Sequence, residues 1–274
     1  MEENRGVRGL LGLLGHPLGH SFSVAYFREK FSDFPQRGLV YRNFDFEDLA
    51  DGIRQLRGCG LLRGFNVTIP YKKRVMAYLD GISDEAAAIG AVNTVAVEAS
   101  TGRWIGHNTD TLGFWESLQD FLQGQPVRRD AKALVLGNGG ASQAVQYALA
   151  RHGISYDLAC RPEHAPCAGC GSLRPFAPQR VLPYASLSED MFRDEIFLIV
   201  NTTSLGMHPC VDEAPRIPYE GLGVSHYAFD LVYNPAETLF LRRCREQGAN
   251  VRNGLDMLYR QADAAWRIWA SSSL

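Results

Sequence analysis

The sequence predicts an α/β fold, in which helices cover the faces of β-sheets. One observation behind this prediction is that short apolar segments alternate with helical patterns along the chain. Another is a strand, a glycine-rich turn and a helix in succession between residues 133 and 151, and the strands that follow are typical of a doubly wound sheet. Strands are expected at 10–14, 39–44, 61–67, 91–97, 104–108, 133–136, 156–160, 196–201, 228–232 and 249–252. Helices are expected at 21–31, 47–56, 71–79, 83–89, 109–122, 142–151 and 254–269.

Composition excludes several classes of protein. The 274 residues are 46% apolar and 21% charged, which is typical of a globular chain with one large or two ordinary domains. The net charge of −2 gives no reason to expect nucleic acid or a membrane as partner. The six cysteines are too sparse for a disulfide framework. Residues 5–14 resemble a signal peptide, but Gly12, Gly15 and Pro17 interrupt them, which favours a first strand. We therefore expect a cytoplasmic protein.

The stretch 66–72 carries the clearest candidate chemistry. Pro70 is well placed to begin a helix that runs from Tyr71, because its ring pre-sets the helical φ. Asn66, Thr68 and Lys72 then lie at the carboxyl end of a strand, the edge where α/β sheets bind ligands. These side chains can hold a small polyhydroxylated acid and move a proton. The alternative is a capped turn with a solvated lysine.

Asp110 is the expected partner of Lys72. It begins a helix, so the positive end of the helix dipole keeps its carboxylate ionised. An ammonium beside a carboxylate is the acid/base pair that a carbonyl reduction needs. The alternative is an ordinary first-turn acid. Asn93 interrupts an apolar strand, where an amide is unfavourable, so it requires a bulge or a ligand.

The glycine turn 137–142 predicts dinucleotide binding. Its glycines let the backbone approach a pyrophosphate at the amino end of the helix that follows. The second strand of this unit ends in Arg161 instead of an acid, which favours NADP over NAD because an arginine accommodates the 2′-phosphate.

No metal site is predicted, although two groups of residues contain ligand types that metals use. His16 and His20 have ligand-like spacing but no third ligand near them in sequence. Cys167 and Cys170 form half of a zinc motif beside Cys160 and His164, and a reduced surface loop is the simpler interpretation.

Taken together, these motifs resemble the shikimate dehydrogenase family over nearly the whole chain. The matches follow the family's order: Gly15-His16-Pro17 with Ser21 and Ser23, 66–72, 91–94, 108–110, 137–142, 201–207, 230–233 with Pro235, and 254–261. The resemblance implies two α/β domains. Residues 1–109 and 254–274 would form a substrate domain with a mixed sheet, and residues 110–253 a Rossmann-like NADP domain.

The resemblance also implies roles for individual residues. Lys72 and Asp110 would be the catalytic pair in the reversible reduction of 3-dehydroshikimate by NADPH. The protein would be a monomer or homodimer. The substrate would be held by Ser21, Ser23, Asn66, Thr68, Asn93 and Gln261, with Tyr233 close by. The cofactor would contact Gly137, Gly139, Gly140, Ala141, Arg161, Thr203, Leu231 and Gly254, with Asp84 near the nicotinamide.

Two departures from the family pattern leave alternatives open. The family's Asn-Arg-Thr and its second Arg are replaced by Cys160-Arg161-Pro162-Glu163, which weakens the prediction of NADP unless Arg174 or Arg180 compensates. Val24 stands where the family often has Pro. The alternatives are a quinate/shikimate or aminoshikimate dehydrogenase using NAD, and a non-catalytic nucleotide sensor on the same fold. The intact Lys72 and Asp110 argue against the sensor.

Overall fold

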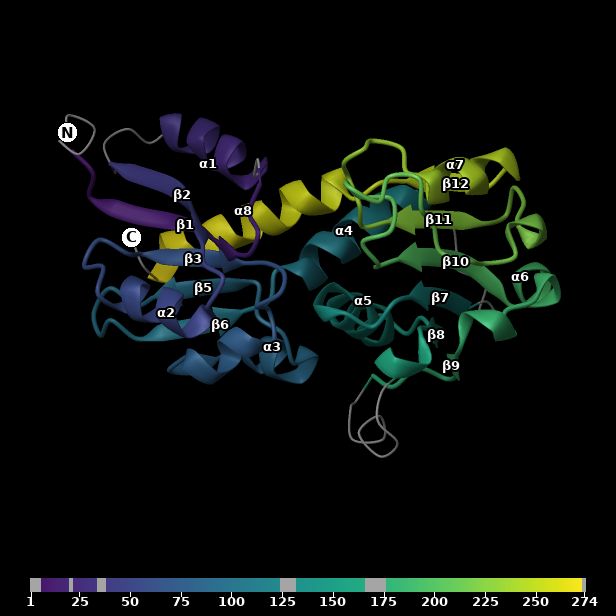
Figure 1. The fold of residues 1–274 in the computed structure, drawn as a ribbon, viewed down its shortest axis with the longest axis horizontal. Coiled ribbons are helices and arrows are strands. Elements are labelled where there is room, and N and C mark those ends of the chain that lie inside the picture. The colour runs from purple at the N-terminus through teal and green to yellow at the C-terminus, as the bar shows by residue number, and fades with distance from the viewer. Residues whose placement is uncertain (1–5, 20–21, 34–37, 124–131, 166–175, 273–274) are drawn as a thin grey trace. The chain divides into compact units, whose positions relative to one another are not determined.

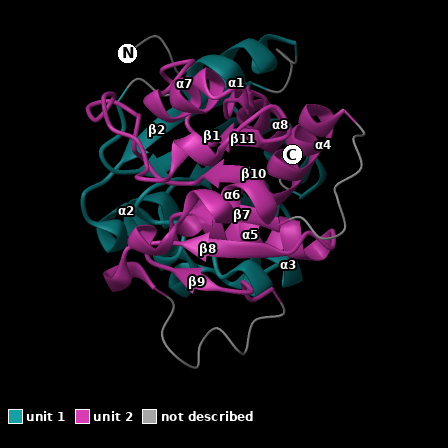
Figure 2. Cartoon of the chain, turned by 90° about the vertical axis from the view of Figure 1, so that its right-hand side faces the viewer, with its two compact units in different colours: residues 1–109, 262–274 teal, residues 110–261 magenta. Residues whose placement is uncertain are grey.

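The computed structural model describes residues 6–19, 22–33, 38–123, 132–165 and 176–272. The chain forms two compact units, coloured separately in Figure 2. Unit 1 comprises residues 1–109 and 262–274, and unit 2 comprises residues 110–261. The expected division instead assigned all of residues 254–274 to the first domain, whereas the structural boundary falls within the last helix.

Unit 1 contains a mixed six-stranded sheet of order β2-β1-β3-β5-β6-β4 (Figure 1). Strand β1 is parallel to both of its neighbours, while β5 is antiparallel to β3 and to β6. The strands are β1 Gly9–Gly15, β2 Leu39–Asp45, β3 Gly64–Val67, β4 Gly81–Ile82, β5 Thr94–Val97 and β6 Trp104–His107. Its helices are α1 Phe22–Ser32, α2 Leu49–Arg57, α3 Asp84–Ile89 and the 3₁₀ helix η2 Arg74–Tyr78.

Local sequence explains how these helices begin and how the last helix packs. Asp48 caps α2 by accepting a hydrogen bond from the Asp51 N–H, and Ser83 caps α3 in the same way. In unit 1 the buried Trp269 of α8 (Leu255–Ser272) donates its indole N–H to the Val95 carbonyl at 3.0 Å. A Cβ on Gly64 would lie 2.4 Å from that indole nitrogen, so this close packing requires glycine.

Unit 2 contains a parallel six-stranded sheet of order β12-β11-β10-β7-β8-β9. Consecutive strands proceed outward in both directions from the β7/β10 pair, so the topological switch point lies between these two strands. The strands are β7 Lys132–Leu136, β8 Tyr156–Ala159, β9 Val181–Leu182, β10 Ile196–Asn201, β11 Tyr227–Asp230 and β12 Asn250–Arg252. The helices besides α8 are α4 Asp110–Leu122, α5 Gly140–Arg151, α6 Glu189–Asp194 and α7 Leu239–Glu246.

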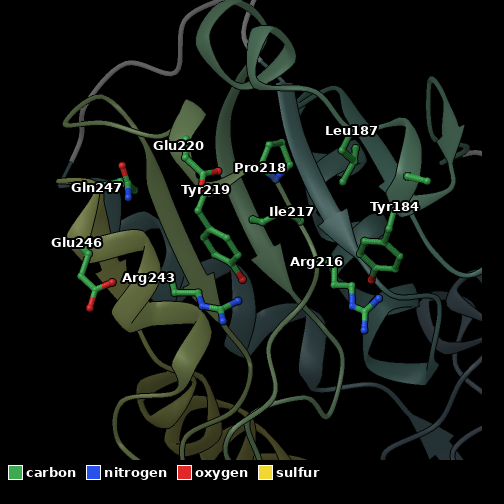
Figure 3. A pocket seen from close by; sticks show the side chains of 11 residues that line it. Tyr184, Leu187, Arg216, Ile217, Pro218, Tyr219, Glu220, Arg243, Glu246 and Gln247 are labelled. Atoms are coloured by element: carbon green, nitrogen blue, oxygen red, sulfur yellow. The ribbon is translucent and has the colours of Figure 1, made fainter.

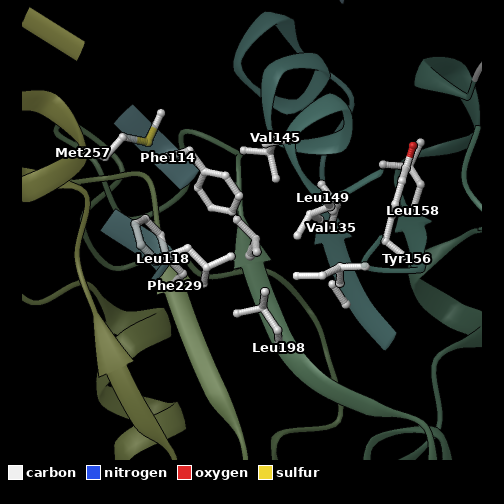
Figure 4. Close-up of a cluster of buried hydrophobic side chains, with 14 of the residues drawn as sticks. Phe114, Leu118, Val135, Val145, Leu149, Tyr156, Leu158, Leu198, Phe229 and Met257 are labelled. Atoms are coloured by element: carbon white, nitrogen blue, oxygen red, sulfur yellow. The ribbon is translucent and has the colours of Figure 1, made fainter. Parts of the chain in front are cut away.

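Two apolar clusters of buried residues hold unit 2 together. In the first, Phe114 and Leu118 of α4 pack with Val135, Leu198 and Phe229 of the central strands (Figure 4). The rings of Phe114 and Phe229 meet edge-to-face, 5.3 Å apart between centroids. The second cluster packs residues of α6 and α7 against other side chains of the same sheet. Helices therefore cover both sheet faces, and the loops at the strand ends are left for ligands.

The α/β fold class is confirmed, but the helix predicted at residues 71–79 is wrong. The chain turns instead, and only the 3₁₀ helix η2 follows. The physical reason is that the Lys72 carbonyl accepts the Val92 N–H at 2.8 Å, so it is not used for a helical bond. Tyr71 is buried, and its hydroxyl donates to the Phe46 and Glu47 carbonyls at 2.6 and 2.7 Å. Helices α6 and α7 and the short strands β4 and β9 were not predicted.

Candidate active site

A buried network of amides and hydroxyls centres on Asn66 at the end of β3. Tyr41 donates its hydroxyl to Asn66 Oδ1 at 2.8 Å. The Asn66 amide nitrogen in turn donates to Thr94 Oγ1 at 3.1 Å and to the Asn93 carbonyl at 3.3 Å. Burial raises the pKa of Tyr41 well above its ordinary value, with a hydrogen bond to Ser23 acting in the opposite direction, so Tyr41 is a neutral donor. Asn66 is therefore held in one orientation from both sides.

Asn93 continues this network to Thr109, which is part of unit 1. It lies directly before β5, and its Oδ1 accepts the Thr109 N–H at 2.8 Å. Its amide nitrogen is 3.0 Å from Thr109 Oγ1. We expected a bulge or a ligand to explain an amide in this apolar segment. The structure shows another reason, which is that Asn93 joins two backbone segments and lies just outside the strand.

The two expected proton-transfer residues are attached to this network through the chain. Lys72 is half-buried, and the hydrogen bond from Val92 to its carbonyl holds its backbone beside the segment that contains Asn93. Asp110 is buried and follows Thr109 directly as the first residue of α4. Lys72 belongs to unit 1 and Asp110 to unit 2.

The remaining expected substrate residues are distributed between the units. In unit 1, Thr68 is half-buried and its backbone pairs with Leu14 and Tyr71, whereas Ser21 lies outside the described residues. In unit 2, Gln261 of α8 is half-buried and donates to the Leu258 carbonyl at 2.9 Å. Burial raises the pKa of Tyr233, so its phenol is neutral.

The glycine turn between β7 and α5 in unit 2 has an open backbone. Gly137 has φ +96°, and a Cβ there would approach Thr203 Cγ2 at 2.9 Å, so both its conformation and its surroundings require glycine. Gly139 is the N-cap of α5, and no atom lies within 4 Å of the position of a Cβ on this residue. The first N–H groups of α5, from Gly140 and Ala141 onward, follow this open position. Such a turn fits a pyrophosphate.

Side chains on both sides fix the shape of this turn. Ser142 Oγ donates to the Gly137 carbonyl at 2.6 Å. Asn138 accepts from Gln143 Nε2 at 2.6 Å and donates to the His164 carbonyl at 2.8 Å. The turn is therefore preformed, and it is tied to the segment that follows β8.

A second buried network lies beneath the loops that follow β10 and β11. Asn201 Oδ1 accepts the Thr203 N–H and hydroxyl at 3.1 and 2.7 Å, and its amide nitrogen donates to Asp230 at 3.0 Å. Asp230 also accepts the Val232 N–H at 3.0 Å and the Thr238 hydroxyl at 2.6 Å. Burial raises the pKa of Asp230 from 3.8 to about 7, although these three hydrogen bonds act in the opposite direction.

This network orients two of the expected nicotinamide-side residues, and backbone packing orients a third. Thr203 is fixed through Asn201, and Leu231 through the hydrogen bond from its N–H to the Asn201 carbonyl at 2.9 Å. A Cβ on Gly254 would lie 2.2 Å from the Leu231 carbonyl oxygen, so Gly254 permits that close approach. In unit 1, Asp84 is an exposed carboxylate in the first turn of α3.

The two described arginines considered for the 2′-phosphate have different surroundings. Arg161 follows β8 and is largely exposed, with its Nε 3.4 Å from Glu163. Arg180, one of two arginines that could compensate for the missing family arginine, pairs at 2.6 Å with each of Asp157 and Glu195. Asp157 is fully buried, so Arg180 neutralises an internal charge. Arg174 lies outside the described residues.

The structure adds three observations about metals, membranes and cavities. Within the described ranges, no three His, Cys, Asp or Glu side chains are arranged to hold a metal, and no helix has the length and apolar character needed to cross a membrane. His20, Cys167 and Cys170 lie outside those ranges, and His16 pairs with Asp45 at 2.7 Å.

A pocket of about 730 Å³ in unit 2 is lined by other residues, including Arg216, Tyr219 and Arg243, and by none of the expected site residues (Figure 3).

Sequence reasoning missed several residues that shape the site. Tyr41, Thr94 and Thr109 complete the Asn66 network, and Thr238 completes the Asp230 network. Thr238 had a detectable signal, because it caps α7 by accepting the Leu241 N–H at 3.3 Å. Tyr41 had none, because its partner lies 25 residues further along the chain.

Comparisons with known proteins agree in one family. A model of the shikimate dehydrogenase substrate binding domain matches residues 13–95. A shikimate dehydrogenase (NADP(+)) from Caldanaerobacter subterraneus subsp. tengcongensis is 41% identical over 263 residues, covering 95% of this chain and 91% of that protein.

Two solved structures show the same fold. The shikimate 5-dehydrogenase of Thermus thermophilus, in complex with NADP(H) and shikimate, has a TM-score of 0.78 and 34% identity, covering 95% of this chain and 93% of that one. The quinate dehydrogenase of Corynebacterium glutamicum, in complex with NAD, has a TM-score of 0.82 and 28% identity, covering 97% of this chain and 94% of that one.

Proposed function

The chain belongs to the shikimate dehydrogenase family, and we propose that Lys72 and Asp110 are the pair that transfers the proton in its reaction. That reaction is the reversible NADPH-dependent reduction of 3-dehydroshikimate to shikimate, a step in aromatic amino-acid biosynthesis. The supporting observation is the buried network of Asn66, Asn93 and Thr109. This network holds the backbone segments from which Lys72 and Asp110 extend.

We assign the substrate's hydroxyls and carboxylate to polar side chains of unit 1 and to two residues of unit 2, one after β11 and one in α8. The assigned residues are Ser21, Ser23, Asn66, Thr68, Asn93, Tyr233 and Gln261. Amides and hydroxyls suit this task because they donate and accept without introducing charge. The amides of Asn66 and Asn93 are already oriented by their neighbours, so little conformational freedom is lost when they bind.

The residues of unit 2 fit NADP. The open position at Gly139 and the amino end of α5 suit the pyrophosphate, and Arg161 suits the 2′-phosphate. Thr203, Leu231 and Gly254 are assigned to the nicotinamide side, with Asp84 near it. When bound, NADPH supplies hydride to the carbonyl carbon of the substrate.

Lys72 Nζ gives its proton to the carbonyl oxygen as negative charge develops there. In this proposal the Asp110 carboxylate is the anionic partner of the Lys72 side chain. In the oxidative direction the same nitrogen accepts the proton of the substrate hydroxyl. In this proposal Lys72 Nζ therefore acts as the general acid in one direction and as the general base in the other.

The test replaces Lys72 by Ala, with Lys73→Ala as the matched control because it removes the same charge from the next residue. Lys72→Ala should lower kcat by about a hundredfold or more while circular dichroism stays unchanged. Lys73→Ala should keep most of the rate. A folded Lys72→Ala protein with most of its activity would remove Lys72 from the proton-transfer role.

A quinate dehydrogenase acting with NAD is the second candidate, and the structural likeness to the quinate dehydrogenase of Corynebacterium glutamicum favours including it. Initial rates should be measured with shikimate and with quinate, each against NADP and NAD. The proposed function predicts the highest kcat/KM for shikimate with NADP. A higher value for quinate with NAD would select the second candidate, and no turnover with any pair would favour a sensor.

We also propose a cytoplasmic enzyme that works as a monomer or homodimer without nucleic acid or membrane partners. The net charge of −2 supports the absence of such anionic partners. Sedimentation of the purified chain, alone and with anionic vesicles, tests the oligomeric state and the membrane part of this proposal.

A further inference from the structure

The turn after β8 places a carboxylate next to the arginine assigned to the cofactor. Glu163 Oε1 is 3.4 Å from Arg161 Nε, and both side chains are largely exposed, at 60% and 64% of their full accessibility. The His164 ring also faces the Arg161 guanidinium, with nitrogen-to-nitrogen distances of 3.3 and 3.4 Å. The guanidinium of Arg161 is thus already contacted by two side chains of its own turn.

This arrangement is held by the glycine turn. Residues Pro162–His164 form the short 3₁₀ helix η3, and the His164 carbonyl accepts from Asn138 at 2.8 Å. Asn138 belongs to the turn assigned to the pyrophosphate. The short helix that carries Glu163 is therefore tied by a hydrogen bond to the turn assigned to the pyrophosphate.

The expected effect of Glu163 on cofactor binding follows from its negative charge beside the positive charge of Arg161. An exposed ion pair stabilises a protein by only about 0–1 kcal/mol, so Glu163 is not needed to hold the fold. A 2′-phosphate that binds Arg161 must share the guanidinium with a carboxylate and also approach a like charge. The 2′-hydroxyl of NAD meets no such repulsion.

We propose that Glu163 sets the cofactor preference of this chain by competing with the 2′-phosphate of NADP for Arg161. The proposal rests on the function given above, because it takes Arg161 to be the phosphate ligand. It makes Glu163 a specificity-determining residue that lowers the discrimination between NADP and NAD.

The experiment measures the dissociation constants of NADP⁺ and NAD⁺ by titration calorimetry on the purified full chain. Glu163→Gln, which keeps the shape and removes the charge, should lower the Kd of NADP⁺ about threefold to tenfold and change that of NAD⁺ by less than about twofold. Glu246→Gln is the matched control, because it removes an exposed carboxylate elsewhere on unit 2 and should change neither constant. Equal changes for both cofactors, or no change in either, would overturn the proposal.

A second pair of variants tests whether Glu163 acts through Arg161. In an Arg161→Ala background, Glu163→Gln should lose most of its effect on NADP⁺. If the full effect persists without Arg161, competition for the guanidinium is wrong. Binding is measured without turnover, so an inactive protein that still shows the preference shift would refute the proposed function and not this inference.

Discussion

The two units hold their expected ligand-binding groups by different physical means. In unit 1 the groups are side chains, and Asn66 and Asn93 are locked by buried hydrogen bonds before any ligand arrives. In unit 2 the groups assigned to the pyrophosphate are backbone groups, with an open position at Gly139. Buried side chains such as Asp230 lie beneath the loops of unit 2 and serve to shape them.

This difference follows from the two ligands. A ring with several hydroxyls is recognised by neutral donors and acceptors at fixed positions, and only oriented side chains provide them. A pyrophosphate is recognised by N–H groups at a helix terminus, which glycine makes accessible. Substitutions in the unit 1 network should therefore damage the fold, whereas those on the open surface of unit 2 should change binding alone.

The largest expected effect concerns the buried carboxylate of unit 2. A pKa raised from 3.8 to about 7 in Asp230 means that the folded state binds its proton more tightly than the unfolded state. This contribution to stability is present below about pH 4 and lost as pH rises to about 7, on the order of 4 kcal/mol. Tyr219 and Cys244 face Asp230, and burial keeps both neutral in this range.

Asp230→Asn should remove that pH-dependent component. The free energy of unfolding, measured in urea between pH 4 and pH 8, should fall with rising pH less steeply in the variant than in the wild type. If the free energy of unfolding changes equally with pH in both proteins, Asp230 is already ionised between pH 4 and pH 8, and its network carries a permanent charge.

The next effect tests the unit 1 network. Asn66→Ala should cost about 2–4 kcal/mol of stability, because the buried Tyr41 hydroxyl and Thr94 each lose a partner. Asn43→Ala is the control, since Asn43 is exposed and makes one long hydrogen bond to Gly19 at 3.4 Å. If Asn66→Ala and Asn43→Ala both lower the stability only slightly, the proposed difference between the two units is wrong.

A third effect separates the two arginines of unit 2. Arg180→Ala should lower stability by about 1–3 kcal/mol, because the buried Asp157 loses its partner, and should leave the NADP to NAD ratio unchanged. Arg161→Ala should leave stability unchanged and weaken NADP much more than NAD. Equal weakening of both cofactors would remove Arg161 from the phosphate site.

The smallest effect on stability is expected at Gly139. Gly139→Ala places its Cβ in open space at a permitted φ of −82°, so the thermal midpoint should stay the same or rise slightly. The Kd of NADP⁺ should nevertheless rise about tenfold if the pyrophosphate occupies that space. Gly137→Ala is the contrasting variant, and it should be destabilised because φ is +96° there. Unchanged affinity in Gly139→Ala would remove this turn from the cofactor site.

The sequence predicted what depends on local pattern. Apolar periodicity identified most strands, and the glycine turn identified the start of α5. It failed at residues 71–79 because the partner of the Lys72 carbonyl is Val92, 20 residues away. It left the role of Arg180 open, because nothing local indicates that Asp157 is buried beside it. Contacts between distant segments decided both cases.

Lys72 and Asp110 are proposed to act together, and a double-mutant cycle tests this directly. The kcat of Lys72→Ala, Asp110→Asn and the double variant should be measured with shikimate and NADP at one pH. If the two residues act as a unit, each single variant is strongly impaired and the double variant is barely slower than the worse single one. If the two losses multiply, the residues act independently and the proposed pair is wrong.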